Sequence, residues 1–246
     1  MFDRLSDYHY DLPPELIAQH PAERRDDSRL LVLSRREGSL THSSFAQLGD
    51  FLKPGDLLTM NDTRVVPARV YGRKPTGGAV EVVLSKKLTG GEWEAVVGAK
   101  GRAKAGMRIL FEGFETEAEI LQSLGEGVYR LRFTGPQEPE EIMEKIGHMP
   151  LPPYIKREAE IPTAPEDRAR YQTIFARSNG AAAAPTAGLH FTPELLAALE
   201  RQGVEHTFVT LHVGPGTFLP IREDDLAQVH LHSERALYPQ TAAEAV

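Results

Sequence analysis

Six short β-type runs lie between residues 65 and 133, and they restrict the possible folds of the chain more than any other feature. Glycines separate the runs, at Gly77-Gly78, Gly90-Gly91, Gly101 and residues 125–127. Short strands with glycine turns between them are typical of a small closed barrel or sandwich. We therefore predict six strands, at residues 65–71, 80–86, 93–97, 107–111, 116–122 and 128–133.

The segments on either side of these runs have mixed helical and strand patterns. Before them, the pattern predicts strands at 30–34 and 56–60 and a helix at 44–52; after them, helices at 140–146, 165–176 and from Thr192, and strands at 204–213 and 233–238. The fold class predicted is α/β, a main domain interrupted by an inserted small six-stranded β-barrel domain. The expected division is 1–62 and 150–246 for the α/β domain and 63–149 for the barrel.

The last residues predict a helix start. Thr241 and Glu244 have the spacing of a capping box, yet only Ala245 and Val246 follow. Isolated helices shorter than about 12 residues are marginal in water. We therefore expect the second part of the α/β domain to be truncated at this end, and a disordered tail is the alternative.

Composition limits the chemistry. With 41% hydrophobic and 26% charged residues, the chain has an ordinary globular composition, and its lack of a long apolar run or signal-peptide pattern predicts a cytoplasmic protein without membrane contact. The absence of cysteine excludes disulfides and thiolate nucleophiles. A net charge of -7 disfavours the binding of nucleic acid unless the protein has a local basic patch. The most basic stretch contains Lys100, Arg102, Lys104 and Arg108. These side chains either form a solvent-exposed face or contact phosphates.

Two stretches near the end of the chain, 184–192 and 210–218, each place small residues and hydroxyls around one histidine. Close passage of the backbone at Gly188, Gly214 and Gly216 would let Thr186, His190, His212 and Thr217 face one cleft. The alternative is that these glycines only form turns and that the histidines are ordinary core or surface groups. The position of both stretches beside a predicted strand end and a helix start favours a site.

Two further groups allow more than one interpretation. Asn61, Asp62 and Arg64 follow a predicted strand, where they either form a turn or, together with Arg69, bind a ribose or phosphate. His230, His232 and Glu234 alternate, so on an extended segment they point the same way and would suit zinc or iron. Surface strands also carry such residues by chance.

Matching segments along almost the whole chain resemble the S-adenosylmethionine:tRNA ribosyltransferase-isomerases of queuosine biosynthesis. They are residues 12–19, 28–33, 54–58, 61–69, 150–155 and 171–176, and the two stretches at 184–192 and 210–218. The resemblance implies an α/β domain with an inserted barrel. It also implies transfer and isomerisation of the ribosyl part of S-adenosylmethionine onto 7-aminomethyl-7-deazaguanine at the tRNA wobble position, which gives epoxyqueuosine and releases adenine and methionine.

The resemblance implies S-adenosylmethionine as a consumed substrate, a tRNA anticodon stem-loop as partner, no cofactor and no metal, and we expect a monomer. As a hypothesis, His190 and His212 carry out the proton transfers. The expected substrate-binding residues are Asn61, Asp62, Arg64, Arg69, Thr186, Gly188, Gly214, Gly216, Thr217, His232 and Glu234; those for RNA are Lys100, Arg102, Lys104 and Arg108. A metal-dependent hydrolase using His230, His232 and Glu234, or a noncatalytic tRNA-binding fragment, remains the alternative.

Overall fold

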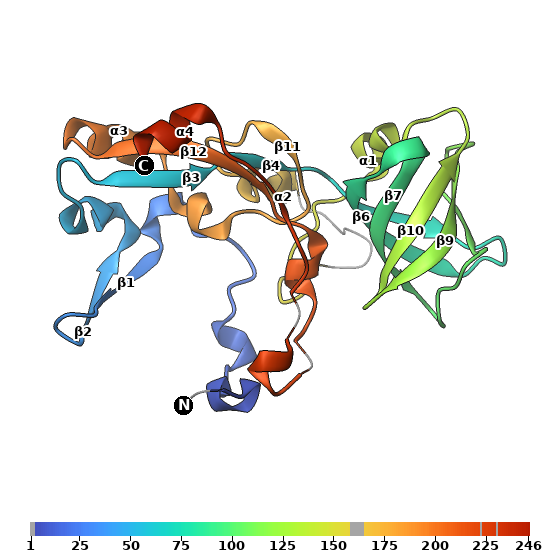
Figure 1. Ribbon diagram of the computed structural model, residues 1–246, viewed down its shortest axis with the longest axis horizontal. Helices are drawn as coiled ribbons and strands as arrows, with labels where there is room; N and C mark the ends of the chain where they lie inside the picture. The colour runs from blue at the N-terminus through green and yellow to red at the C-terminus, as the bar shows by residue number, and fades with distance from the viewer. Residues whose placement is uncertain (1–2, 158–164, 222, 230) are drawn as a thin grey trace.

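The six predicted β runs form a closed antiparallel barrel in the computed structural model, which describes residues 3–157, 165–221, 223–229 and 231–246. The order around the barrel is β10-β7-β6-β5-β8-β9, and the barrel forms one end of the molecule (Figure 1). The strands are β5 (Arg69–Arg73), β6 (Ala79–Lys87), β7 (Glu92–Ala99), β8 (Arg108–Leu110), β9 (Glu117–Gly125) and β10 (Val128–Thr134). The predicted barrel is thus confirmed.

Alternation of side chains explains why these strands close on themselves. In β7, Trp93, Ala95 and Val97 point into the barrel while the residues between them face outward. Ile109 and Ile120 are fully buried in the same core. The helix α1 (Pro139–Ile146) packs Ile142 and Met143 onto this core. A short 3-10 turn, η5 (Thr89–Gly91), connects β6 to β7.

The main domain is built around two parallel strand pairs. β3 (Leu57–Asn61) pairs with β12 (Glu205–His212), and β13 (Arg235–Leu237) adds to β12 in the antiparallel direction. β4 (Thr63–Val65) pairs with β11 (Ser178–Ala181). The helix α3 (Pro193–Arg201) and the 3-10 helix η4 (Phe45–Phe51) pack against this region through a core that includes Phe45, Met60, Phe191, Leu195 and Leu199.

The remaining elements are short. β1 (Arg29–Ser34) and β2 (Ser39–Ser44) form a hairpin that projects from the main domain (Figure 1). The other elements are η1 (Leu5–Tyr8), η2 (Pro14–Leu16), η3 (Arg25–Asp27), α2 (Pro165–Arg170), η6 (Thr186–His190), η7 (Pro215–Phe218), η8 (Leu226–Gln228) and α4 (Gln240–Ala245). Of the helices in the described ranges, none combines the length and apolar character needed to cross a membrane.

Several elements differ from the sequence-based expectation. The predicted strand 65–71 is two strands, because β4 pairs with β11 in the main domain whereas β5 belongs to the barrel, with Pro67 between them. The predicted helix 44–52 is a 3-10 helix with a kink at Gln47. The helix starting at residue 165 ends at Arg170 rather than at 176.

At the C-terminal end, the predicted capping box is wrong. The helix α4 begins at Gln240, so Thr241 lies inside it and Pro239 takes the N-cap position. The Gln240 side-chain amide contacts Glu244 Oε1 at 2.6 Å, and this pairing occupies the carboxylate that the capping box required. The division of the chain into domains at residues 62 and 149 stays a prediction.

Candidate functional site

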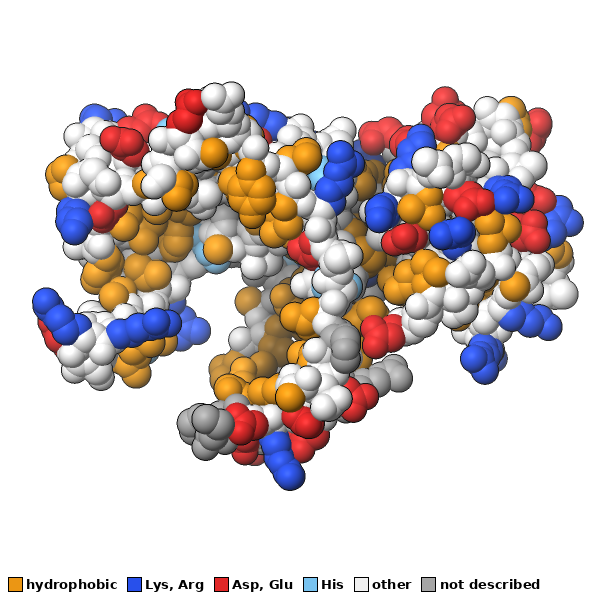
Figure 2. Space-filling view, in the orientation of Figure 1, with side chains coloured by type: hydrophobic (Ala, Val, Ile, Leu, Met, Phe, Trp, Pro, Cys, Tyr) orange, Lys and Arg blue, Asp and Glu red, His pale blue; other side chains and the backbone are white. Residues whose placement is uncertain are grey.

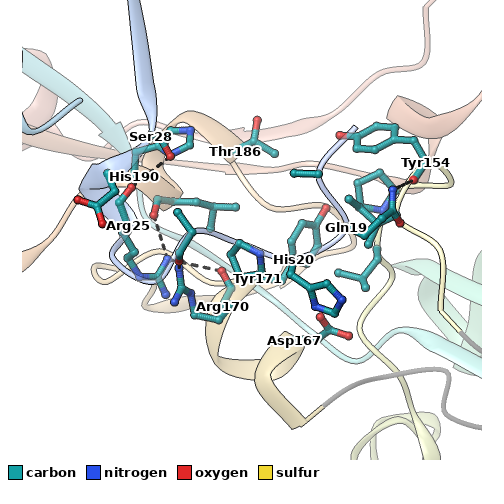
Figure 3. Close-up of a pocket in the computed structure, with 18 of the residues that line it drawn as sticks. Gln19, His20, Arg25, Ser28, Tyr154, Asp167, Arg170, Tyr171, Thr186 and His190 are labelled. Carbon is teal, nitrogen blue, oxygen red and sulfur yellow. Dashed lines mark hydrogen bonds between the residues drawn. The ribbon is translucent and has the colours of Figure 1, made fainter. Parts of the chain in front are cut away.

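A cavity lies between the N-terminal segment and the loops of the main domain. It has a volume of about 620 Å³, and residues from four segments, within 18–29, 151–157, 167–171 and 186–190, contribute to its walls (Figure 3). Pockets of this size accommodate a small organic substrate. Of the predicted site residues, Thr186 and His190 line it.

Polar contacts attach the N-terminal segment to the opposite wall. Gln19 Nε2 donates to the Tyr154 carbonyl at 3.0 Å, and Gln19 Oε1 accepts from the Lys156 amide at 2.7 Å. Arg157 donates to the carboxylate of Asp167 through two nitrogens, at 2.9 and 2.7 Å. Because both partners of this ion pair are largely buried, it fixes the wall at residues 151–157 against α2.

His190 is at the end of η6, immediately before the start of α3. Its ring centroid is 5.2 Å from that of Phe45, and within the described residues no hydrogen bond engages its imidazole. Thr192 caps the next helix, accepting a hydrogen bond from the Leu195 amide at 3.1 Å. A Cβ at Gly188 would lie 2.9 Å from the Thr173 methyl and 3.0 Å from Phe175. Gly188 therefore allows η6 to pack closely, which fixes the backbone that presents His190.

A second group of predicted residues gathers at the end of β12. His212 Nδ1 and Thr63 Oγ1 are 2.8 Å apart, and the ring lies against Gly180, where a Cβ would be 2.9 Å from it. Burial lowers the pKa of His212, nearby Arg235 adds to this effect, and Asp62 opposes it. A lowered pKa keeps the imidazole neutral near pH 7, the form that accepts a proton.

His232 and Glu234 lie against the loop that follows β12. Glu234 Oε1 accepts from the Gly214 amide at 3.2 Å and is 3.0 Å from His232 Nε2. The His232 ring packs on Gly216, where a Cβ would approach it to 2.5 Å. Thr217 is exposed in the same loop, and His230 is outside the described residues. None of these described residues lines the 620 Å³ cavity, so the structure separates them from His190 and Thr186.

Asn61, Asp62, Arg64 and Arg69 all make contacts within the protein. The Asn61 amide pairs with both backbone groups of Leu211, at 2.9 and 3.0 Å, and so extends the β3/β12 ladder. Asp62 Oδ1 accepts from Thr210 Oγ1 at 2.6 Å. Arg64 donates to the Ala176 carbonyl at 2.7 Å, while Arg69 pairs with Glu81 at 2.9 Å. These contacts stabilise the strand ends.

The basic stretch of the barrel divides into two kinds of residue. Arg108 forms an ion pair with Glu117 on the neighbouring strand. Lys100, Arg102 and Lys104 are exposed in the loop after β7, without a carboxylate partner in the described part of the chain. Blue and red side chains alternate over the barrel in Figure 2. Across the described ranges, no group of three or more His, Asp or Glu side chains is arranged to hold a metal ion.

The cavity also contains residues that the sequence reasoning did not select. His20 Nδ1 is 3.1 Å from Glu166 Oε1, and Arg25, Arg170 and Tyr171 line the same space. Burial raises the pKa of Tyr171 to about 12, so its hydroxyl stays protonated. One signal was available, because the matching segment 12–19 leads directly into this wall.

Known proteins match this sequence over almost its whole length. Residues 5–246 match the family model described as "Queuosine biosynthesis protein". A protein from Citrifermentans bemidjiense is 50% identical over 98% of this chain and 70% of its own length, and one from Aquifex aeolicus is 43% identical over 99% and 71%. Both are named S-adenosylmethionine:tRNA ribosyltransferase-isomerase.

A solved structure is also similar in sequence. The crystal structure of the S-adenosylmethionine tRNA ribosyltransferase from Thermotoga maritima is 31% identical; the match covers 96% of this chain and 62% of that one, with a TM-score of 0.38. The chain thus spans about 70% of the length of the first curated relatives. By the family match and the identities to the curated relatives, the chain belongs to the queuosine biosynthesis protein family, whose members among these relatives are named S-adenosylmethionine:tRNA ribosyltransferase-isomerase.

Proposed function

We propose that this chain transfers and isomerises the ribosyl part of S-adenosylmethionine onto 7-aminomethyl-7-deazaguanine at the tRNA wobble position. The products are epoxyqueuosine in the tRNA, free adenine and methionine. S-adenosylmethionine is consumed as a substrate, and no further cofactor takes part. The observation that carries the proposal is the 50% identity, along 98% of the chain, to a protein named S-adenosylmethionine:tRNA ribosyltransferase-isomerase.

The cavity supports the proposal through its size and its free imidazole. The reaction needs a base for the acidic proton next to the sulfonium, a proton donor for the departing adenine, and contacts to the ribose hydroxyls. His190 lines the cavity without a hydrogen-bonding partner among the described residues, which leaves both ring nitrogens available for proton transfer. The Thr186 hydroxyl lines the same space and is suited to a ribose hydroxyl.

The cluster at the end of β12 has a different place in the proposal. His212 is the second acid–base candidate, because its lowered pKa keeps it neutral. Asn61, Asp62 and Arg64 act as positioning residues, since their contacts hold the ends of β3 and β12. Of the remaining substrate-binding candidates, Gly188 acts through the close packing of η6 and Arg69 through its pair with Glu81. We assign Gly214, Gly216, Thr217, His232 and Glu234 to a second binding surface at the end of β12, separate from the cavity.

The test is direct. The protein is incubated with S-adenosylmethionine and an anticodon stem-loop carrying 7-aminomethyl-7-deazaguanine, and adenine and the modified nucleoside are quantified by mass spectrometry. We expect adenine release that requires the modified RNA. We expect the variant His190→Ala to lower turnover by about 10²- to 10⁴-fold, the usual contribution of a general acid or base.

The matched control is His42→Ala, because His42 is exposed on the β1–β2 hairpin and does not line the cavity. This variant should keep wild-type turnover. Folded wild-type protein that releases no adenine with the modified RNA would contradict the proposal. Full turnover of His190→Ala would contradict only the role of His190. The metal-dependent hydrolase has no support from the described residues, since no metal-binding group occurs among them.

A further inference from the structure

Two arginines in the wall of the cavity lie next to each other, and neither has a carboxylate partner among the residues that the structure describes. Arg25 comes from η3 and Arg170 ends α2, and Figure 3 shows their side chains close together at one end of the cavity. Arg25 Nη1 contacts the Arg170 carbonyl at 3.5 Å. Burial lowers the pKa of Arg25, and the positive charge of Arg170 adds to this effect. No ion pair of either residue occurs within the described chain.

Backbone carbonyls hold both guanidinium groups in place. Arg25 donates to the carbonyls of Leu189 at 3.0 Å and Ala169 at 2.9 Å, in addition to that of Arg170. Arg170 donates to the carbonyls of Glu23 at 3.0 Å and Ala22 at 2.6 Å. Two guanidinium groups offer ten N–H donors in total, of which these contacts use five. Arg170 Nε is buried and has no hydrogen-bonding partner in the described part of the chain.

Most other charges in the cavity wall are already paired. Arg24 pairs with Asp26 at 3.1 Å, Arg157 pairs with Asp167 at 2.7 Å, and His20 contacts Glu166 at 3.1 Å. Asp27 and Arg29, which are both exposed, also line the cavity and have opposite charges. The excess positive charge of the wall is therefore concentrated at Arg25 and Arg170.

Guanidinium groups that are fixed in place and have unused N–H donors are suited to bind an oxyanion. Hydrogen bonds between a guanidinium and an oxyanion are strong because both groups are charged, and the planar guanidinium matches the geometry of a carboxylate. We propose that Arg25 and Arg170 form an anion subsite that binds the carboxylate of the amino-acid part of S-adenosylmethionine. This inference rests on the proposed function. Because Leu189 precedes His190 in η6, the subsite lies beside the proposed acid–base group.

An RNA phosphate is the other oxyanion among the proposed substrates. Three apolar or aromatic side chains, Leu151, Tyr171 and Leu189, line the same cavity and suit the methylene groups that precede an amino-acid carboxylate. Leu151 and Tyr171 are buried, and Arg25 and Arg170 are only partly exposed. A phosphate on a strand of RNA would require a more open surface, which favours the carboxylate.

The first measurement uses wild-type protein and two ligands. Calorimetry compares S-adenosylmethionine with its decarboxylated analogue, which keeps the sulfonium and the adenosine but lacks the carboxylate. We expect the analogue to bind about ten- to a hundredfold more weakly, the range for hydrogen bonds to a charged group. Equal affinity of the two ligands would overturn the inference.

The second measurement uses the variant Arg170→Gln. It should weaken the binding of S-adenosylmethionine by about the same factor and leave the affinity for the decarboxylated analogue unchanged. The matched control is Arg168→Gln on the same helix, since Arg168 pairs with Glu144 and does not line the cavity. Equal weakening of both ligands by Arg170→Gln would overturn the carboxylate assignment.

A third arm separates the two sources of oxyanion. Binding of the anticodon stem-loop is measured for wild type and Arg170→Gln at several salt concentrations. We expect no change in the salt dependence. A loss of RNA affinity with unchanged binding of S-adenosylmethionine would overturn the assignment in favour of a phosphate. If wild type binds neither ligand, the proposed function itself fails, and that result differs from each outcome above.

Discussion

Two glycines of the candidate site have an unexpected close neighbour, the ring of a histidine. Gly180 has a φ of 147° and faces the His212 ring, and Gly216 faces the His232 ring, with the hypothetical Cβ at 2.9 and 2.5 Å. Glycine is therefore required at both positions for the imidazoles to lie where they do. The sequence predicts a close approach of the backbone at Gly216 but singles out nothing at Gly180, and at both positions the partner in the structure is a side chain of the same chain.

Two partly buried histidines, His148 and His212, predict a dependence of stability on pH. Burial lowers the pKa of His212 and of His148 from the ordinary value, so the unfolded chain binds these protons more readily than the folded chain. The stabilisation is complete above the unfolded pKa, about 6.5, and is lost as the pH falls through the lower folded pKa. The free energy of unfolding, measured with urea, should decrease between pH 7.5 and pH 5.

A double variant, His148→Gln and His212→Gln, checks the origin of this decrease. If the two histidines cause it, the slope of stability against pH over this range should be smaller in the variant than in wild type. His42→Gln is the control, because His42 is exposed on the hairpin. An unchanged slope in the double variant would assign the pH dependence to other groups.

At the scale of elements, the regular strands of the barrel could be predicted from the sequence, and the irregular segments that form the cavity wall could not. The alternation of Trp93, Ala95 and Val97 is visible in the sequence because a barrel strand has one buried face. The prediction of a single strand at 65–71 is wrong, because the run contains the end of β4 and the start of β5. Only the tertiary pairing of β4 with β11 distinguishes the two strands. The cavity wall at residues 18–29 escaped prediction because it consists of extended segments and a single 3-10 turn, which have no periodic pattern.

Helix α3 provides a test at this scale. Thr192 Oγ1 accepts from the Leu195 amide at 3.1 Å, and the helix buries Leu195 and Leu199 in the core. Removing this cap in Thr192→Ala should cost about 1 kcal/mol of stability in urea unfolding. Thr192→Ser keeps the hydroxyl and should retain most of the stability. If both variants are equally destabilised, lost packing of the threonine methyl, and not the cap, is responsible.

For the whole molecule, charge is distributed unevenly. Residues 69–134, which contain the barrel strands, carry eleven Lys and Arg against eight Glu, a net charge of +3, although the chain as a whole carries -7. At one end of the barrel, Lys74 Nζ donates to the Lys100 carbonyl at 2.9 Å, which brings the β5–β6 turn beside the loop after β7. We propose that this basic end, formed by Arg73, Lys74, Lys100, Arg102 and Lys104, contacts tRNA phosphates.

Salt dependence tests this surface. Each phosphate contact contributes about 0.7 to the slope of log affinity against log salt for single-stranded nucleic acid. A variant with Lys100, Arg102 and Lys104 changed to Gln should therefore bind the stem-loop more weakly and reduce that slope by about 2. Arg108→Gln should have a smaller effect, because Glu117 already compensates its charge. Arg132→Gln, whose partner is Glu92 at 2.8 Å, is the control. An unchanged slope in the triple variant would place the RNA on another face of the protein. Binding of S-adenosylmethionine is measured in parallel, and an unaltered affinity would show that the cavity of the triple variant is intact.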